Sequence, residues 1–299
     1  MIENFKKFSI KNMVESAKKL SLLIEKLIIV GKGAKYGQVV FLAGGAGSGK
    51  GFAAKNFMEG EKFKIRDVDE WKNIFLRIAV LKKKYKEIRH LKMRNPNDVA
   101  TLHQWIEKKG IKDKTLTLLL KDARQGRLPN IMFDTTLKSR GKITGILPSL
   151  LEAGYDPKNL HVVWVLTNWA TAVKQNKDRE RVVPAEIMLK THVGAANTMY
   201  TMILSGTPKG LDGGVYIVLG GKEHNVVWTD KSGKPIKTGK NKDTFVIKDF
   251  SYLTMKEPGK SMTKEIGLQK QAHAWIMKQA PEAFKSNWFS KTKQEKNNL

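Results

Sequence analysis

Two spacings of hydrophobic residues alternate along the chain. Continuous apolar runs are typical of strands covered on both faces, and they occur in "VVFLA" (39–43), "IMF" (131–133) and "LHVVWVL" (160–166). Between these runs, apolar residues recur every three to four positions, which is typical of helices. The alternation predicts an α/β fold, in which a parallel sheet is flanked by helices.

The longest helical pattern follows "FKIRDVDEW" (63–71), which we interpret as a short strand ending in Asp67 and Asp69. One face of this predicted helix is apolar and the other is basic. "NPND" (95–98) ends the helix and offers a cap for the next one, so residues 71–125 are predicted to form a helical insertion. The apolar face carries Ile74, Phe75, Ile78, Leu81, Tyr85 and Ile88, and the basic face carries Lys82, Lys83, Lys84, Lys86, Arg89, Lys92 and Arg94 against the single Glu87.

Two more helices are predicted further along. "ITGILPSLLEAGY" (143–155) is interpreted as one helix that stops at Gly154, and the segment 183–204 as another with Pro184 in its first turn. Residues 207–299 are predicted to be a β-rich and helical extension, with strands in "GGVYIVLGG", "NVVWTDKSGKP" and "DTFVIKDFSYL" and a helix around 263–278. Because no segment has the composition of a linker, residues 1–299 are interpreted as a single domain with its core at 37–206.

The N-terminal segment 1–36 has apolar residues at helical spacing among lysines and glutamates. Its longest apolar run, 27–30, is far too short to cross a bilayer. We therefore expect an amphipathic helix packed on the domain of a soluble, cytoplasmic protein with no membrane partner. Attachment to a membrane surface is the alternative, because some basic amphipathic helices lie on membranes. The apolar positions are Phe5, Phe8, Met13, Ala17, Leu20, Ile24 and Leu27.

The charge of the chain is strongly positive, with 55 Lys and Arg against 28 Asp and Glu and a formal net charge of +27. Such a surface attracts nucleic acid, anionic membrane or nucleotides, although a bias toward solubility gives the same composition. The absence of cysteine excludes disulfides, thiolate metal sites and cysteine nucleophiles. The six histidines show no spacing typical of a zinc site or a catalytic triad.

A glycine-rich loop follows the first strand and fits the phosphate-binding pattern G-x-x-x-x-G-K. In this pattern, backbone N–H groups at a helix N-terminus surround a phosphate, and the lysine reaches across it. The next position is normally Ser or Thr, whose hydroxyl ligates Mg²⁺, but here it is Gly51; Ser48 is poorly placed to substitute. The anion cradle does not need that hydroxyl, so we expect nucleotide binding with weaker metal affinity. A purely structural turn is the alternative. The loop comprises Gly44, Gly45, Ala46, Gly47, Ser48, Gly49, Lys50 and Gly51.

Other candidate groups are carboxylates at strand ends and a charged stretch. Asp67 and Asp69 could accept a proton beside the loop or could cap the following helix. Asp134 follows a buried strand, where a carboxylate is costly unless it meets water, metal or ligand. "KDRER" (177–181) supplies arginines that could neutralise a phosphoryl group, or it is a solvated charged stretch.

In four ordered segments the chain resembles the zeta-toxin-like branch of P-loop kinases, which is related to the polynucleotide kinases. These segments are "GGAGSGKG", "RDVDEWK", "FDTTLKS" and "RERVVP", within residues 38 to 205. The resemblance implies ATP and Mg²⁺ as cofactors, Asp69 as general base, Arg179 and Arg181 as lid arginines, and Asp134 and Thr136 facing the substrate, with Asp134 also at the metal. It departs from the family at Gly51, at Asp134, where a glutamate is usual, and in its long basic helix.

The resulting expectation is a kinase that transfers the γ-phosphate of ATP to a hydroxyl. The resemblance implies a sugar nucleotide as acceptor, whereas the charge favours the 5′-hydroxyl end of a nucleic acid. An inhibitory protein partner and a phage or mobile-element origin would fit the toxin-like character. The alternative is a nucleotide-binding protein without turnover that binds nucleic acid or a protein assembly.

Overall fold

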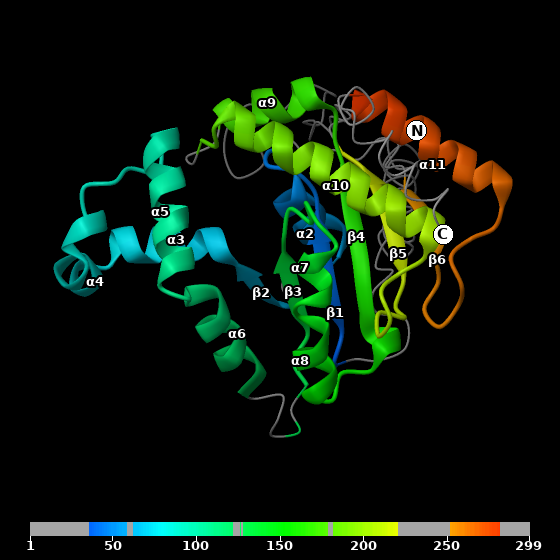
Figure 1. The fold of residues 1–299 in the computed structure, drawn as a ribbon, viewed down its shortest axis with the longest axis horizontal. Helices are drawn as coiled ribbons and strands as arrows, with labels where there is room; N and C mark the ends of the chain where they lie inside the picture. The colour runs from blue at the N-terminus through cyan, green and yellow to red at the C-terminus, as the bar shows by residue number, and fades with distance from the viewer. Residues whose placement is uncertain are drawn as a thin grey trace, which may run out of the picture.

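A six-stranded sheet in the order β2-β3-β1-β4-β5-β6 forms the centre of the molecule (Figure 1). The computed structural model describes residues 36–58, 62–121, 126, 128–178, 182–220 and 252–281. Strands β1 to β5 are parallel, and β6 runs antiparallel to β5. The predicted α/β fold with a parallel sheet is therefore confirmed. The strands are β1 (Val39–Ala43), β2 (Lys64–Asp67), β3 (Ile131–Asp134), β4 (Leu160–Leu166), β5 (Val215–Leu219) and β6 (Tyr252–Lys256).

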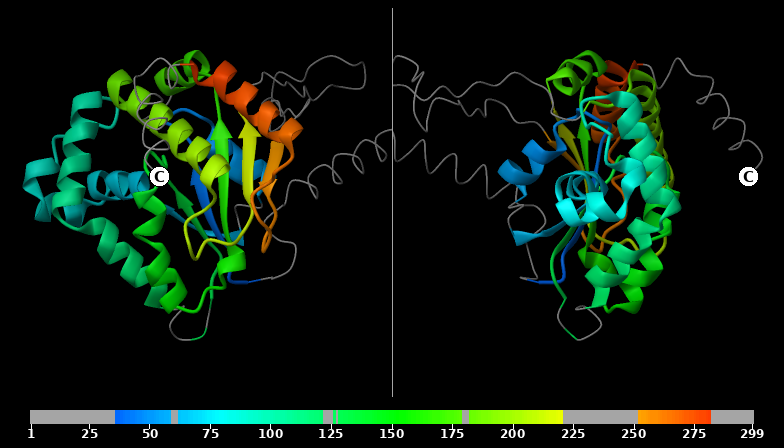
Figure 2. Two further views of the ribbon diagram at one scale, coloured as in Figure 1. Left: turned by 45° about the vertical axis from the view of Figure 1, so that its right-hand side comes forward. Right: turned by 90° about the vertical axis from the view of Figure 1, so that its left-hand side faces the viewer.

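Helices cover both faces of this sheet, which explains why β1, β4 and β5 are buried throughout and, apart from His161, are built of apolar and aromatic residues. On one face, Ala53 and Ala54 of α2 (Lys50–Phe57) pack against Val40 and Leu42 of β1. The opposite face is covered by α7 (Gly141–Thr144), α8 (Leu147–Glu152), α10 (Ala185–Ser205) and α11 (Ile266–Gln279), as the edge-on view in Figure 2 shows. None of the helices among the described residues is long and apolar enough to cross a membrane.

The prediction of one long helix from residue 71 onward is wrong, because the helix is interrupted at two positions. It forms α3 (Val68–Arg77), α4 (Ala79–Lys84) and the short 3-10 helix η3 (Lys86–Ile88). Ile78 adopts an extended conformation and Tyr85 leaves the helical region. The breaks turn Tyr85 back toward Phe75 and Trp105, and the three rings meet edge to face with centroids 5.0–5.7 Å apart. Packing of these three rings thus takes the place of the continuous helix that the periodicity predicts.

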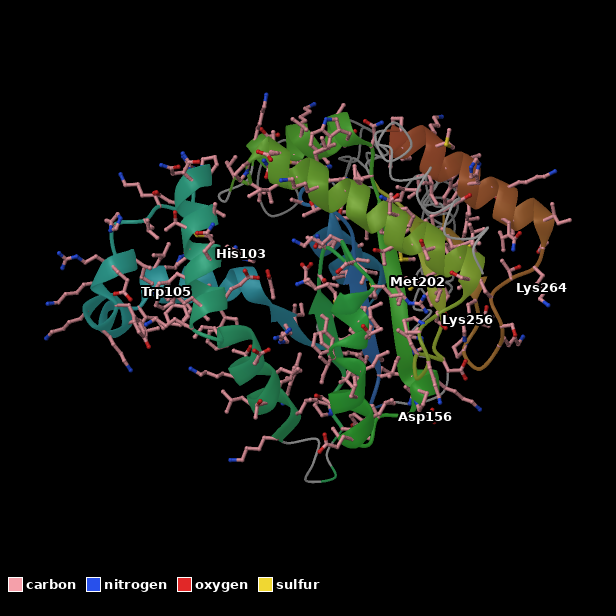
Figure 3. The ribbon with its side chains drawn as sticks, viewed as in Figure 1. His103, Trp105, Asp156, Met202, Lys256 and Lys264 are labelled. Atoms are coloured by element: carbon pink, nitrogen blue, oxygen red, sulfur yellow. The ribbon has the colours of Figure 1, made fainter. Side chains whose placement is uncertain are left out.

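The helices between β2 and β3 form a projecting lobe with its own apolar cluster (Figure 3). Trp105 lies in α5 (Pro96–Lys108), which precedes α6 (Ile111–Lys121). As predicted, Asn95 caps α5: its side chain accepts a bond from the backbone N–H of Asn97, and Pro96 opens the helix. We call residues 68–121 the helical lobe.

The helix predicted over 143–155 is also broken. Gly145 ends α7, and Pro148 lies in the first turn of α8. Gly154 stops α8 as expected, with a φ of +95° that favours glycine. The α10 and α11 helices match their predicted segments, whereas the predicted N-terminal helix, the strand in "NVVWTDKSGKP" and most of the strand in "DTFVIKDFSYL" lie outside the described residues.

The sheet changes direction of winding between β1 and β4, which are neighbours. From β1 the chain passes through α2 to β2 on one side, and from β4 it passes through α9 (Trp169–Lys177) and α10 to β5 on the other. In open α/β sheets, such a switch point leaves a crevice at the carboxyl ends of the strands where ligands bind. The glycine loop directly follows β1, so it lies at this position.

Acid is expected to destabilise the fold through His161, which is buried at the start of β4. Its Nδ1 accepts a bond from the Gly214 N–H, so Nε2 carries the proton and donates to Gln38. Burial, and then the charge of Lys256, lower the pKa of His161 from 6.5 to about 4. Between these values the unfolded chain binds more protons than the folded one, so stability falls as pH drops through this window, by on the order of 3 kcal/mol for this group.

Urea unfolding at pH 7 and pH 4 of the parent and of His161→Gln measures this effect. The variant should be less stable at pH 7 and lose less stability on acidification. An equal loss in both proteins would contradict the assignment.

Candidate phosphate-binding site

The glycine loop (residues 44–51) connects β1 to α2 and ends in an uncapped helix N-terminus. Gly49 occupies the cap position with a φ of +85°, which a side chain would disfavour, and no side chain caps the helix. The first bond at this end runs from the Ala53 N–H to the Gly49 carbonyl. Within the described part of the chain, the N–H groups of Gly47, Gly49, Lys50 and Gly51 have no acceptor. Four unsatisfied donors at a helix N-terminus suit an anion.

Lys50 folds back over this loop. Its Nζ donates to the carbonyls of Gly44 at 2.9 Å and Gly45 at 3.2 Å, and lies 3.6 Å from Oδ1 of Asp134. The ammonium group therefore lies between the start of the loop and the end of β3. This position lets one cation serve a phosphate group held by the helix N-terminus.

Side chains from outside the loop donate hydrogen bonds to two more of its carbonyls. The Thr167 hydroxyl at the end of β4 donates to the Ser48 carbonyl at 2.7 Å, and Nε2 of His192 on α10 bonds to the Ala46 carbonyl at 2.8 Å. Thr191 accepts a long bond of 3.4 Å from the Ala46 N–H. Burial lowers the pKa of His192, its bond to Ala46 opposes that shift, and the charge of Lys50 adds to it. Sequence patterns did not identify Thr167, Thr191 or His192.

The loop glycines do not share one purpose. A Cβ on Gly45 would collide with the His192 ring, and one on Gly47 would lie 2.4 Å from the Ala172 carbonyl. These two glycines make room for α10 and α9. At Gly49 and Gly51, by contrast, a Cβ would meet no atom within 4 Å. Packing therefore requires glycine at Gly45 and Gly47, whereas Gly49 and Gly51 border open space.

Gly51→Ser is expected to lower the Mg²⁺ concentration needed for half-maximal ATP binding or turnover. Space for the side chain is present, and the new hydroxyl stands where the usual loop supplies a metal ligand. Gly51→Ala is the matched control, because both replacements favour the helix and only serine adds a ligand. Metal titrations followed by calorimetry distinguish them; the same metal dependence in both variants would contradict a role for this position at the metal.

Two carboxylates meet at the ends of β2 and β3. Asp67 and Asp134 are register partners on these parallel strands, and Asp134 is also the partner of Leu42, two residues before the loop. Both carboxylates therefore lie at the carboxyl ends of the strands, on the same side of the sheet from which the glycine loop leaves β1. Asp69 is the second residue of α3, so it lies within the helix instead of at the strand end; its side chain is outside the described part. The sequence did not predict that Asp67, and not Asp69, would lie beside Asp134, because strand register is a property of the sheet.

The segment after Asp134 is held in a constrained conformation. Leu137 is fully buried with a φ of +49°, which is uncommon for a residue other than glycine. The Leu137 N–H bonds to the Thr135 hydroxyl, and a Cβ on Gly194 of α10 would collide with the Lys138 backbone. Thr136 lies within this segment and is partly exposed.

Arg179 and Arg181 lie outside the described residues, but the chain beside them is fixed. The Asn176 side chain in α9 bonds to both the N–H and the carbonyl of Val183, at 3.0 and 2.9 Å. Val183 also packs in a small cluster with Ala46 of the loop. The end of "RERVVP" therefore lies against the glycine loop.

A metal ion would find few protein ligands here. Among the described residues, no group of three or more His, Asp or Glu could hold one. Mg²⁺ commonly binds through one or two carboxylates together with phosphate oxygens and water. Asp134, with Asp67 beside it in register, fits that pattern.

Comparison with known proteins gives only distant likenesses. No protein-family model matches the chain, and no curated protein matches it significantly. Solved structures similar to it include AvrRxo1-ORF1:AvrRxo1-ORF2 with sulphate ions (TM-score 0.42, 12% identity, covering 88% of this chain and 70% of that chain). The same pair with ATP gives a TM-score of 0.42 and 12% identity over 86% of this chain and 70% of that one. The PezAT toxin-antitoxin system of Streptococcus pneumoniae gives a TM-score of 0.41 and 13% identity, covering 68% of this chain and 75% of that chain.

These similarities are low in both superposition and sequence, so the assignment of the fold rests on the strand order and the glycine loop of the chain itself.

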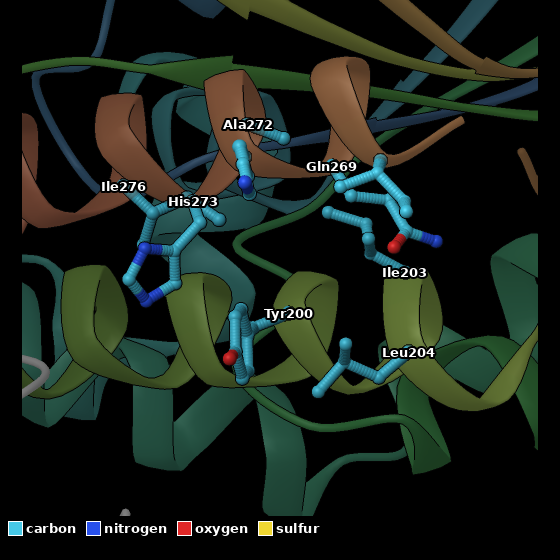
Figure 4. Close-up of a pocket in the computed structure, with 9 residues that line it drawn as sticks. Tyr200, Ile203, Leu204, Gln269, Ala272, His273 and Ile276 are labelled. Atoms are coloured by element: carbon cyan, nitrogen blue, oxygen red, sulfur yellow. The ribbon is translucent and has the colours of Figure 1, made fainter. Parts of the chain in front are cut away.

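A separate hollow of about 280 Å³ lies between α10 and α11 (Figure 4). Tyr200, Leu204 and His273 are among the side chains that line it. Tyr200 follows His192 by two turns of α10, about 12 Å along the helix. The hollow is thus distinct from the glycine loop, and its mainly apolar lining does not resemble a phosphate site.

Proposed function

We propose that the protein is an ATP-dependent phosphotransferase. The observation that carries this proposal is the glycine loop, where four unsatisfied N–H groups, an uncapped helix and Lys50 meet at the switch point of the sheet. Phosphoryl transfer depends mainly on positioning and on neutralising charge, and these groups are of the required kind. ATP would be held by residues 44–51, with Mg²⁺ at Asp134 and the phosphate oxygens.

The acceptor would approach from the side of β2 and β3. Asp69 is proposed as the general base, Arg179 and Arg181 as the residues that neutralise the transferring phosphoryl, and Thr136 as a contact to the substrate. The strained backbone at Leu137 supports a functional role for this segment, because such strain concentrates at functional sites. The cluster of Val183 with Ala46 supports placing the arginine segment beside the loop.

Two acceptor classes remain in this proposal, a sugar nucleotide and the 5′-hydroxyl end of a nucleic acid. The exposed tip of the helical lobe, residues 83–94, favours the nucleic acid as acceptor. Its one acidic residue in 83–94, Glu87, already accepts a bond from Trp105 Nε1. Six exposed basic residues against this one carboxylate leave a net positive charge that attracts phosphates. The exposed basic residues there are Lys83, Lys84, Lys86, Arg89, Lys92 and Arg94.

Incubation with γ-labelled ATP and a panel of sugar nucleotides, nucleosides and 5′-hydroxyl oligonucleotides tests the proposal. Transfer of label to one class identifies the acceptor. ATP binding without transfer to any of them would favour the second candidate, a nucleotide-binding protein without turnover, which the missing hydroxyl at Gly51 supports.

Charge reversal at the lobe tip is expected to weaken nucleic-acid binding. Each lost phosphate contact should reduce the slope of log affinity against log salt by about 0.7 for a single strand. The triple variant Lys83→Glu, Lys84→Glu, Lys86→Glu is compared with Lys264→Glu, Lys270→Glu, Lys278→Glu, which makes the same change of charge on and beside α11. Equal weakening by both variants would show a general charge effect and contradict a specific role for the lobe.

A further inference from the structure

Two carbonyls of the glycine loop accept hydrogen bonds from side chains that belong to other elements. His192 reaches the Ala46 carbonyl from α10, and Thr167 reaches the Ser48 carbonyl from the end of β4. Both residues are buried, at 6% and 1% exposure, so neither bond competes with solvent. A carbonyl can only accept, so the Nε2 atom of His192 must carry a proton.

The direction of each held carbonyl fixes the direction of the next N–H. All peptide bonds among the described residues are trans, and in a trans peptide the C=O and N–H of one unit point in opposite directions. Turning the Ala46 carbonyl toward α10 therefore turns the Gly47 N–H away from α10. In the same way, the bond from Thr167 turns the Gly49 N–H away from β4. These two N–H groups are among those without an acceptor in the described structure.

The packing around His192 fits a positioning role. Gly45 leaves the space that the imidazole ring occupies, since a Cβ there would lie 2.1 Å from the ring. The ring also meets Trp169 of α9 edge to face, with centroids 5.6 Å apart. Thr191, the preceding residue, contacts the N–H of the same Ala46. The imidazole ring is therefore packed between Gly45 and Trp169, which restricts its orientation.

We infer that His192 and Thr167 are positioning residues that hold the glycine loop in its anion-binding form, by aiming the Gly47 and Gly49 N–H groups at the phosphates of the nucleotide. This inference rests on the proposed function. Neither side chain touches the phosphate; each acts through a loop carbonyl. Without these bonds the two peptide groups can rotate, and a carbonyl turned toward the phosphates would repel them.

Paired substitutions separate the hydrogen bond from the packing. His192→Met and Thr167→Val keep approximate size and remove the donor, whereas His192→Gln and Thr167→Ser keep a donor. ATP and inorganic tripolyphosphate affinities are measured by calorimetry, with thermal melts on the same preparations. We expect the donor-lacking variants to bind about tenfold more weakly, the usual worth of a lost bond of this kind, and the donor-keeping variants to bind within about twofold of the parent.

The control is His161→Met. His161 is as buried as His192 and bonds to Gln38 and Gly214 at the opposite end of β4, away from the loop. This substitution should lower the melting temperature without changing either affinity. As a second readout, the Gly47 and Gly49 amide resonances should shift on ATP addition in the parent and shift less in the donor-lacking variants.

The possible results separate the positioning role from the proposed function. If the parent binds ATP and the donor-lacking variants bind equally well, the inference is overturned and the proposed function stands. If the parent binds neither ATP nor tripolyphosphate, both are overturned. Should His192→Met not fold, Thr167→Val, which is nearly isosteric, carries the test alone.

Discussion

Lys50→Ala is expected to weaken ATP binding by about 10- to 100-fold, the range for losing a hydrogen bond to a charged group. Lys50 Nζ is the described cation that lies directly on the glycine loop, bonded to the Gly44 and Gly45 carbonyls and near Asp134. Removing it takes away the charge that offsets the phosphates and leaves the Asp134 carboxylate without its counterion, so the anion would face a negative neighbour. Calorimetric titration with ATP measures the change.

The fold should survive this substitution, because the core does not include the Lys50 side chain. Lys190→Ala is the control, since Lys190 is an exposed lysine on α10 that pairs with Glu186. Equal ATP affinity for Lys50→Ala and the parent would rule out the loop as the phosphate site.

Asp69→Asn is expected to lower phosphoryl transfer by about 10²–10⁴-fold, the usual worth of positioned acid–base catalysis. Asparagine keeps the size of the side chain but cannot accept the proton of the attacking hydroxyl. ATP affinity should change little, since the proposed role of Asp69 is toward the acceptor and not toward the phosphate cradle. Initial rates and ATP binding are measured on the same preparations, with thermal melts to exclude misfolding.

Asp67→Asn is the paired variant, and the structure makes it informative. Asp67 lies in register with Asp134 at the strand ends, whereas Asp69 lies one step into α3. If Asp69 is the base, its substitution should cost far more than that of Asp67 in turnover at saturating Mg²⁺. A larger loss for Asp67→Asn would transfer the catalytic role to the strand end, and full activity in Asp69→Asn would leave a nucleotide-binding scaffold as the better account.

The sequence alone determined the strands at the centre of the sheet and the loop that follows the first of them. Strands β1, β3 and β4 were predictable because residues buried on both faces form unbroken apolar runs, which are local in sequence. The glycine loop was predictable because its backbone conformation and its lysine depend on residues within about eight positions of one another. Asp134 was found for the same reason, as a carboxylate directly after a buried strand.

Tertiary structure alone decided where the predicted long helix of the helical lobe is interrupted and which side chains bond to the glycine loop. Tyr85 leaves the helix to meet Trp105, a contact between residues 20 positions apart that helical periodicity does not register. The partners of the loop, Thr167 and His192, are separated from Ser48 and Ala46 by 119 and 146 positions. The pairing of Asp67 with Asp134 arises from strand register. Periodicity reports which side of an element is buried, whereas the identity of the group that meets that side is set by packing between distant segments.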